Sequence, residues 1–246
     1  MKNVILEITS NKQVGKDVFL MRLEGDCSEI KNSGEFINIK LPDKYLRRPI
    51  SVSDFSLNYV DILYKVLGLG TKDMSHYRVG TKLDVLVGLG NGFKINTSIT
   101  PTLIAGGIGI APMISLAKKY NELGIKPTLV YGARSKDDLV LIDDLKKLCN
   151  VYLCTDDGTL GTQGTILDCI SKNKLNIEYY YSCGPYRMLE ALAKAYPNGC
   201  VSLEARMGCG FGACMGCSAT FKSGRKRICK EGPVFETEDI IWENLM

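Results

Sequence analysis

Apolar and polar residues alternate in four short stretches within the first 98 residues. The stretches are Phe19–Leu23, Ile37–Leu41, Val60–Val66 and Leu83–Val87. A period of two places successive side chains on opposite faces, which predicts β-strands. Glycine and asparagine residues between the stretches supply the turns. Several short strands at this spacing predict a small antiparallel β-barrel.

After Pro101, short apolar runs alternate with helical patterns. The runs are 102–105, 128–131, 151–154 and 179–182, and the helical patterns extend to about 121 and then cover 137–149, 165–171 and 185–196. Strands that alternate with helices predict a parallel α/β sheet. Residues 95–117 carry no charge, but their glycines, prolines and polar side chains predict a strand, a turn and a helix rather than a membrane span.

The segment Met207–Cys217 follows neither pattern, because four glycines stand among three cysteines. Such a segment predicts a loop wrapped around a bound group. The fold class expected is therefore α+β multi-domain. We expect an antiparallel barrel domain over residues 1–98, a parallel-sheet nucleotide-binding domain over 99–200 and a small C-terminal domain over 201–246.

Composition narrows the class of protein further. The 246 residues carry a formal charge of +4 without any long run of Lys or Arg, so neither a nucleic-acid partner nor a membrane partner is expected. The amino-terminal residues do not resemble a signal peptide. Ten cysteines without an export signal indicate a reducing compartment, and we expect a cytoplasmic protein.

The spacing of the last four cysteines carries the most specific chemistry. It is Cys209-x4-Cys214-x2-Cys217-x11-Cys229, which is the spacing of plant-type [2Fe–2S] sites. Glycines between the ligands let the backbone approach the sulfur atoms closely. A zinc site is the alternative, although zinc modules usually present two C-x2-C pairs and this chain has one.

Three short segments of the barrel region are candidates for an FAD site. They are Arg48-Pro49-Ile50-Ser51, Leu63-Tyr64-Lys65 and Gly70-Thr71. An Arg can pair with a phosphate, and a Ser can hydrogen-bond a flavin ring. Gly70-Thr71 precedes a predicted helix over Lys72–Tyr77, whose free N–H groups suit a pyrophosphate. The alternative is an ordinary hairpin followed by a Thr N-cap.

Two glycine segments of the α/β region are candidates for binding NAD. Gly107 and Gly109 lie between a predicted strand and a predicted helix, where a pyrophosphate can approach the helix N-terminus. Cys183-Gly184-Pro185 follows the last apolar run, and a packed thiol is the alternative for Cys183. Arg134 could recognise a 2′-phosphate or be a solvated Arg, so the choice between NAD and NADP stays open.

Together these motifs resemble the ferredoxin–NADP reductase superfamily. That superfamily has an R-x-[YF]-[ST] motif, which Arg48 and Ser51 fit and in which Ile50 replaces the aromatic residue. Within the superfamily, the chain resembles the electron transfer subunits of dihydroorotate dehydrogenase B. The matching segments are Arg48–Ser51, Thr155–Gly158, Ser182–Pro185, Leu203-Glu204 and the glycine and cysteine segment Met207–Cys217 that follows.

The resemblance implies a role and a partner. It implies that Cys183-Gly184-Pro185 lies where nicotinamide meets flavin. An FMN-containing TIM-barrel subunit would oxidise dihydroorotate in pyrimidine (UMP) biosynthesis, as a heterotetramer with two copies of each chain. Electrons would pass from FMN through [2Fe–2S] and FAD to NAD+. Neither a pyrimidine site nor a catalytic base is expected on this chain.

Two other functions remain as alternatives. One is a subunit of an NADH-dependent ferredoxin:NADP reductase or of a sulfide dehydrogenase. Several of those subunits have another residue at the first ligand position, so Cys209 favours the dihydroorotate branch. The other is a zinc-stabilised nucleotide-binding protein. The single histidine, His76, is expected to be solvated.

Overall fold

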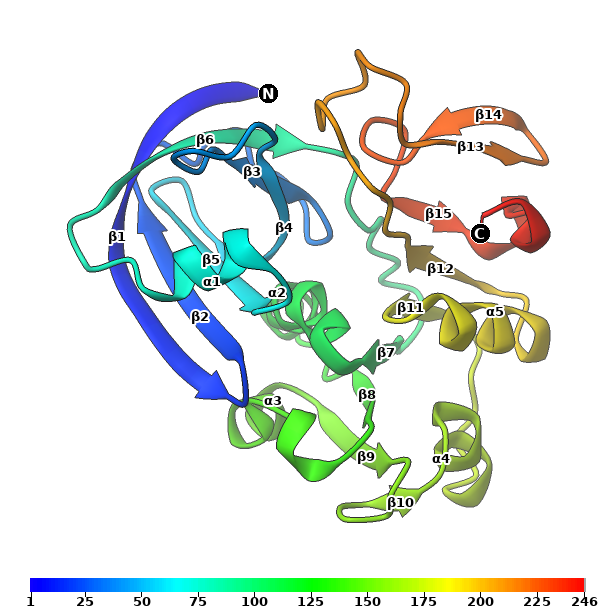
Figure 1. Ribbon diagram of the computed structural model, residues 1–246. Helices are drawn as coiled ribbons and strands as arrows, with labels where there is room; N and C mark the ends of the chain where they lie inside the picture. Colours follow the sequence, from blue (N-terminus) through cyan, green and yellow to red (C-terminus); the bar gives the residue numbers. More distant parts are fainter. Residues whose placement is uncertain (246) are drawn as a thin grey trace.

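Residues 1–245 are described by the computed structural model, which begins with a β-barrel (Figure 1). The six strands are β1 (Lys2–Gly15), β2 (Val18–Glu24), β3 (Phe36–Ile39), β4 (Arg48–Phe55), β5 (Tyr59–Lys65) and β6 (Lys82–Leu89). All neighbours pair antiparallel, and the barrel closes in the order β1-β2-β5-β4-β3-β6. Alternate side chains of each strand fill the barrel interior, as the period of two predicts.

Helix α1 (Leu69–Ser75) connects β5 to β6 and begins earlier than the sequence predicted. Gly70 and Thr71 lie in its first turn rather than before it. The Thr71 hydroxyl accepts the N–H groups of Leu67 and Gly68 at 3.0 and 3.2 Å, which closes the turn at the helix start. Thr71 is therefore not the N-cap, which is Gly68; it is the third helical residue, and its side chain accepts the N–H of the N-cap. His76 at the end of the helix is exposed.

The second half of the chain forms a seven-stranded sheet. Its strands are β7 (Thr102–Gly106), β8 (Thr128–Ala133), β9 (Asn150–Thr155), β10 (Thr162–Gln163), β11 (Tyr180–Cys183), β12 (Gly199–Ser202) and β15 (Val234–Glu236), in the order β10-β9-β8-β7-β11-β12-β15. All pairs are parallel except β12 with β15. The predicted parallel sheet is confirmed.

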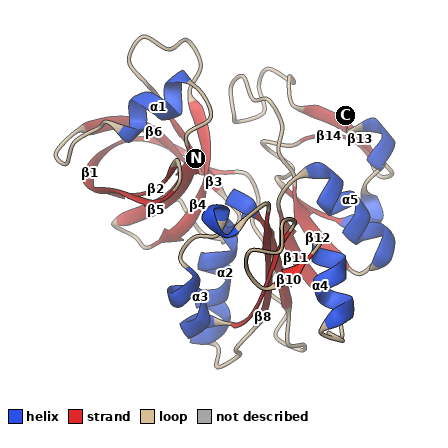
Figure 2. Ribbon diagram, turned by 60° about the horizontal axis from the view of Figure 1, so that its bottom comes forward, coloured by secondary structure: helices blue, strands red, loops and turns tan. Residues whose placement is uncertain are grey.

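Helices cover both faces of this sheet (Figure 2). They are α2 (Ile110–Glu122), α3 (Ile142–Leu148), α4 (Ile166–Lys172) and α5 (Tyr186–Ala195), with short 3-10 turns η1 (Gly107–Gly109), η2 (Lys136–Asp138), η3 (Thr237–Asp239) and η4 (Trp242–Asn244). The helix predicted over 137–149 is wrong in part. Leu141 has a left-handed φ of 57° and Val140 is buried, so η2 and α3 are separated by a short extended segment.

The C-terminal segment is joined to the nucleotide-binding sheet. It contains a hairpin of β13 (Ser218–Phe221) and β14 (Gly224–Arg227), and its strand β15 then pairs with β12. The rings of Phe221 and Phe235 pack with their centroids 4.3 Å apart. The segment therefore shares a core with residues 99–200, and the domain boundaries at 98 and 200 stay predictions.

The barrel and the sheet are connected by packing and by two ion pairs. Helix α2 packs against strand β4 (Figure 2). Lys118 pairs with Asp54 at 2.6 Å, and Lys65 pairs with Asp138 at 2.8 Å. Within residues 1–245, no helix combines the length and the apolar character that crossing a membrane requires.

Candidate redox-cofactor sites

The four cysteines of the spacing motif form two pairs. The N–H of Cys209 donates to the Cys214 sulfur at 3.5 Å, and the N–H of Cys229 donates to the Cys217 sulfur at 3.4 Å. Within the described part of the chain, no three His, Cys, Asp or Glu side chains gather closely enough to hold a single metal ion. Two pairs are what a binuclear cluster requires, because each iron takes two thiolates.

Residues 208–217, here called the cluster loop, surround the first thiol with donors. Cys209 Sγ accepts the N–H groups of Phe211, Ala213 and Cys214 at 3.5, 3.3 and 3.4 Å. Burial raises the pKa of the Cys209 thiol, but the three backbone donors and the Cys214 side chain together outweigh it and lower the pKa to about 6. The loop thus favours a thiolate at this position, which is the form that binds iron. A [2Fe–2S] cluster fits the donor set.

The two glycine segments of the nucleotide-binding unit are in contact. A Cβ on Gly109 would lie 2.2 Å from the Cys183 carbonyl oxygen, and a Cβ on Gly184 would lie 2.9 Å from the Gly106 nitrogen. Gly107 has a left-handed φ of 54°, which turns the chain from β7 into η1. The fold therefore brings together Gly107, Gly109 and Gly184, which lie far apart in the sequence.

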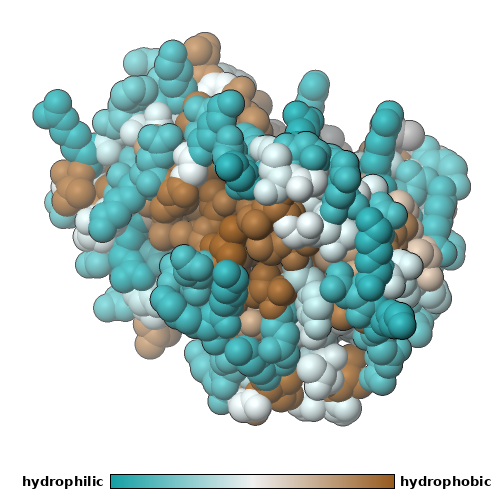
Figure 3. Space-filling view, turned by 90° about the horizontal axis from the view of Figure 1, so that it is seen from below, coloured by the Kyte–Doolittle hydropathy of each residue, from teal (hydrophilic) through white to brown (hydrophobic). Residues whose placement is uncertain are grey.

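A cavity of 670 Å³ opens beside the glycine turn. Most of its residues come from the carboxyl ends of β7, β8 and β9 and from α4 and α5 with the turns before them. The barrel contributes Val18, Lys65 and Leu67. Parallel sheets bind dinucleotides at this edge. Apolar side chains in the lining include Val140, Ile166 and Met188, and the face seen from below has an apolar hollow rimmed by hydrophilic residues (Figure 3).

Charged residues at the outer part of this cavity have both signs. Arg134 and Arg187 line it together with Asp138 and Asp156. Arg134 therefore lies at the cavity, as expected for an adenosine contact. Asp156 belongs to the Thr155–Gly158 segment, and its carboxylate could accept a ribose hydroxyl or repel a 2′-phosphate. The NAD or NADP preference stays a prediction.

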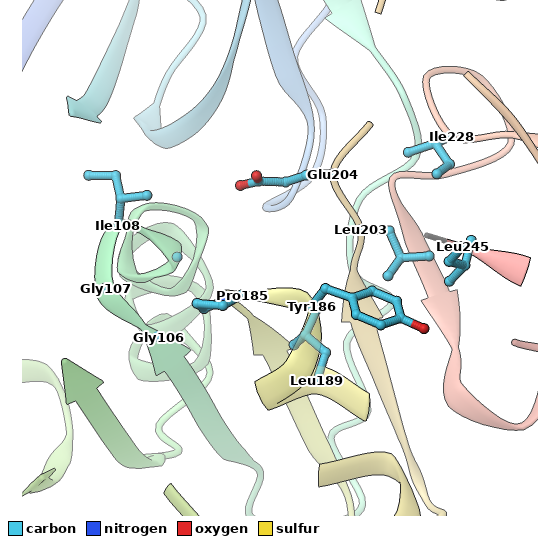
Figure 4. A pocket seen from close by; sticks show the side chains of 12 residues that line it. Gly106, Gly107, Ile108, Pro185, Tyr186, Leu189, Leu203, Glu204, Ile228 and Leu245 are labelled. Carbon is cyan, nitrogen blue, oxygen red and sulfur yellow. The ribbon is translucent and has the colours of Figure 1, made fainter. Parts of the chain in front are cut away.

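A second cavity, of 380 Å³, is also lined by the glycine turn (Figure 4). Gly107 and Pro185 line both cavities. Its far wall contains Glu204 and Ile228, which adjoin the cluster segment in the sequence. Glu204 is exposed at this cavity, but desolvation by the surrounding protein raises the pKa of its carboxyl group, with no opposing cation or hydrogen bond among the described residues. In the sequence, Glu204 belongs to a segment that resembles the family, but nothing else there identifies it as a site residue.

Of the predicted FAD residues, Arg48 and Gly70 come together at one end of the barrel. A Cβ on Gly70 would lie 2.5 Å from Arg48 Nε, so a larger residue there would displace the Arg48 side chain. Arg47 pairs with Asp84 at 2.8 Å, whereas Arg48 bonds only the carbonyls of Leu46 and Arg47 and pairs with no carboxylate of the described residues. An uncompensated guanidinium beside a glycine suits a pyrophosphate.

The other predicted FAD residues have different surroundings. Pro49, Ile50 and Ser51 are half-buried on β4. Leu63 and Tyr64 are packed in hydrophobic cores at 2% exposure each, so any contact with a flavin would be through their backbone. Lys65 lines the 670 Å³ cavity, where it pairs with Asp138.

Cys183 is also buried in the core, which agrees with the alternative that it is a packed thiol. Burial raises the pKa of its thiol to about 12, which keeps the sulfur neutral. Its carbonyl oxygen faces Gly109 at the contact between the turns. A role in NAD binding would therefore come from the backbone shape of Cys183-Gly184-Pro185.

Known families match two parts of the chain. Residues 204–241 match the iron–sulfur cluster binding domain of dihydroorotate dehydrogenase B, and residues 103–194 match an oxidoreductase NAD-binding domain. A protein of Fusobacterium nucleatum subsp. nucleatum, named dihydroorotate dehydrogenase B (NAD(+)), electron transfer subunit, is 39% identical over 95% of this chain and 96% of its own length. The chain belongs to this family.

Other relatives agree with this assignment. The electron transfer subunit of the same name from Bacillus pumilus is 35% identical over 98% of both chains. Among solved structures, a chain of an NADH-dependent reduced ferredoxin-NADP oxidoreductase superposes with a TM-score of 0.88 at 28% identity, covering 98% of this chain and 91% of its own. Phthalate dioxygenase reductase superposes at 0.70 with 18% identity, covering 89% and 86%, and so shares the fold.

Proposed function

We propose that this chain is the electron transfer subunit of an NAD-dependent dihydroorotate dehydrogenase. It carries electrons from a catalytic partner through a [2Fe–2S] cluster and FAD to NAD+, in the pyrimidine (UMP) pathway. FAD supplies the conversion between the single electrons of the cluster and the hydride that NAD+ accepts. The name of the family implies a catalytic subunit, which we infer contains FMN and forms a heterotetramer with this chain in the cytoplasm.

One structural relation supports this function more than any other. The 380 Å³ cavity is lined on one side by the glycine turn and on the other by Glu204 and Ile228, which flank the cluster segment. Ile228 adjoins Cys229, the fourth proposed ligand. The nucleotide turn therefore shares a cavity with residues that flank the proposed cluster ligands. We infer from this that electrons pass in the order cluster, flavin, nicotinamide.

Each group of residues has a proposed role in this arrangement. Cys209 and Cys214 would hold one iron, and Cys217 and Cys229 the other. Arg48 would pair with the FAD pyrophosphate near Gly70, while Pro49 and Ser51 would line the flavin. Gly107, Gly109 and Gly184-Pro185 would shape the turn against which NAD+ lies. No side chain needs to act as a catalytic base, because hydride transfer from a flavin requires none.

The test is to purify the subunit anaerobically, alone and with its co-expressed partner. We expect about one FAD and two irons with acid-labile sulfide per chain. We expect NAD+ reduction by dihydroorotate only when the partner is present. The isolated subunit should still oxidise NADH with an artificial electron acceptor.

Two results would contradict the proposal. A complex that holds flavin and cluster but reduces ferredoxin, and not NAD+ with dihydroorotate, would favour the ferredoxin-linked alternative, which the 0.88 TM-score also supports. A colourless protein with bound zinc that resists reconstitution with iron and sulfide would favour the zinc-stabilised alternative.

A further inference from the structure

Asn38 lies on the outer face of the barrel but is almost completely buried. Its neighbours Ile37 and Ile39 point into the barrel core at 0% exposure, so Asn38 points outward. An outward amide on a small barrel would normally be solvated, yet its exposure is 1%. The cluster loop covers it. This contact joins residues that are 171 positions apart in the sequence.

The amide of Asn38 anchors the backbone of the first proposed cluster ligand. Its Nδ2 donates to the carbonyl oxygen of Cys209 at 3.2 Å. The next residue, Gly210, has a left-handed φ of 79°, and a Cβ there would lie 2.5 Å from Asn38 Nδ2. Only glycine can therefore pass so close to the amide. The Cys209–Gly210 peptide is fixed from the barrel side.

The opposite side of the loop is held by a second contact. Arg227 donates to the carbonyl oxygen of Gly212 at 2.8 Å, and its guanidinium is itself paired with Glu231. Three N–H groups point at Cys209 Sγ. That of Phe211 lies between the two anchors, that of Ala213 belongs to the anchored Gly212–Ala213 peptide, and that of Cys214 is on the next peptide. Donors to a cluster sulfur stabilise the more negative, reduced cluster and raise its reduction potential. The anchors therefore fix the donors that tune the cluster.

Asn38 also shares its face of the barrel with the proposed flavin strand. It stands directly opposite Pro49 in the β3–β4 ladder, and Ser51 follows two residues along on the same face. We propose that Asn38 is a positioning residue, which holds the cluster loop on the flavin-binding face of the barrel and sets the reduction potential of the cluster. This inference rests on the proposed ligation of the cluster by Cys209.

A purely structural role does not explain this side chain well. Its Oδ1 atom is buried and receives no hydrogen bond from any described residue. A buried acceptor without a partner destabilises a fold. An apolar side chain of the same shape would avoid that cost and still fill the space. The hydrogen bond to Cys209 is what such a side chain could not supply.

The test compares the cluster potential in Asn38→Leu and in the wild-type holoprotein by redox titration, followed by EPR and visible absorption. We expect a more negative potential, so that the ratio of reduced to oxidised cluster at the wild-type midpoint falls about threefold to tenfold; tenfold corresponds to about 59 mV for one electron. The EPR line shape of the reduced cluster should change too. Asn38→Ser, which is too short to reach Cys209, should shift the potential in the same direction and provides the test if Asn38→Leu does not fold.

Ser53→Ala is the matched control. Ser53 is also 1% exposed on β4, and its hydroxyl donates to the Asp61 carbonyl within the barrel at 3.0 Å. We expect this change to lower Tm and leave the potential unchanged. If the two Asn38 variants keep the wild-type potential and line shape, Asn38 is only structural. A wild-type protein without iron and sulfide would instead contradict the proposed function itself.

Discussion

Gly109 is the residue at which the two glycine turns of the nucleotide-binding unit touch. A Cβ would lie 2.2 Å from the Cys183 carbonyl oxygen, and backbone atoms cannot rotate away as a side chain can. We expect Gly109→Ala to push the turns apart and to weaken NADH binding at least about tenfold, or about 1.4 kcal/mol. Calorimetric titration of the flavin-loaded subunit with NADH measures this.

Gly124→Ala is the control for Gly109→Ala. Gly124 follows the carboxyl end of α2, whereas Gly109 precedes its amino end. Gly124 has a φ of 76°, and a Cβ there would meet open space. Alanine there is strained, so Tm should fall while NADH affinity stays the same. Equal affinity in both variants would argue against dinucleotide binding at the turn.

Glu204 gives a residue-scale prediction about pH. The protein around its carboxyl group raises the pKa above the unfolded value, but the residue is exposed at the cavity, so solvent screening keeps the effect on stability small. The folded state is therefore disfavoured as the group ionises, and stability is lost as pH rises from the unfolded pKa through the folded one. Glu204→Gln should raise Tm at pH 8 and leave it unchanged near pH 4. A gain of equal size at both pH values would show that charge is not the cause.

At the scale of elements, strand β15 supports the β13–β14 hairpin that precedes Cys229. Phe235 on β15 packs on Phe221 of the β13–β14 hairpin, and both rings are buried. Phe235→Ala should cost about 3–5 kcal/mol of unfolding free energy, because it leaves a cavity. It should also lower the iron content, since the hairpin leads into Cys229.

Phe19→Ala is the comparison for Phe235→Ala. Phe19 is half-buried on β2 of the barrel, where it stacks on Tyr64. We expect it to lower the unfolding free energy by less and to leave iron content unchanged, as denaturant titration and iron assay can measure. Equal loss of iron in both variants would mean that general destabilisation, rather than the hairpin, governs cluster retention.

The elements also show which parts of the fold the sequence could predict. The alternation on β6 and the strand–glycine–helix pattern at β7 and α2 are long enough to be periodic, so both predictions are confirmed. Strand β15 has three residues, which is too short for a period, and its place beside β12 depends on tertiary packing. Helix α1 begins earlier than predicted because the hydroxyl of Thr71, the third helical residue, accepts the N–H of the N-cap residue Gly68.

The same limit applies to the candidate sites. The cysteine spacing predicted the four thiols because three of them lie within one loop. The sequence could assign Arg48 and Gly70 to one site only through the family resemblance, because their contact depends on closure of the barrel. Asn38 gave no signal at all, because its partner Cys209 lies 171 residues away.

At the scale of the whole molecule, two exposed apolar side chains lie in the cluster loop. Phe211 and Met215 are 39% and 49% exposed, and apolar groups exposed beside a redox centre suit a docking surface for the catalytic partner. Met215→Asp should therefore lower dihydroorotate-dependent NAD+ reduction of the complex by about tenfold or more. NADH oxidation by the isolated subunit with an artificial acceptor should be unchanged. Asp tolerates the left-handed φ of 61° at this position, so the loop should keep its shape.

Leu123→Asp separates docking from a general effect of added charge. Leu123 is also 49% exposed, but it follows α2 and precedes β8, at the amino-terminal edge of the sheet. Leu203 and Glu204, by contrast, leave the carboxyl end of β12 toward the cluster loop. If the partner docks at the cluster, Leu123→Asp keeps full activity in the complex while Met215→Asp loses it. Equal loss in both variants would show a general effect of added charge. Full activity in both variants would place the docking surface away from the cluster loop, and the electrons would then enter by a route that does not begin there.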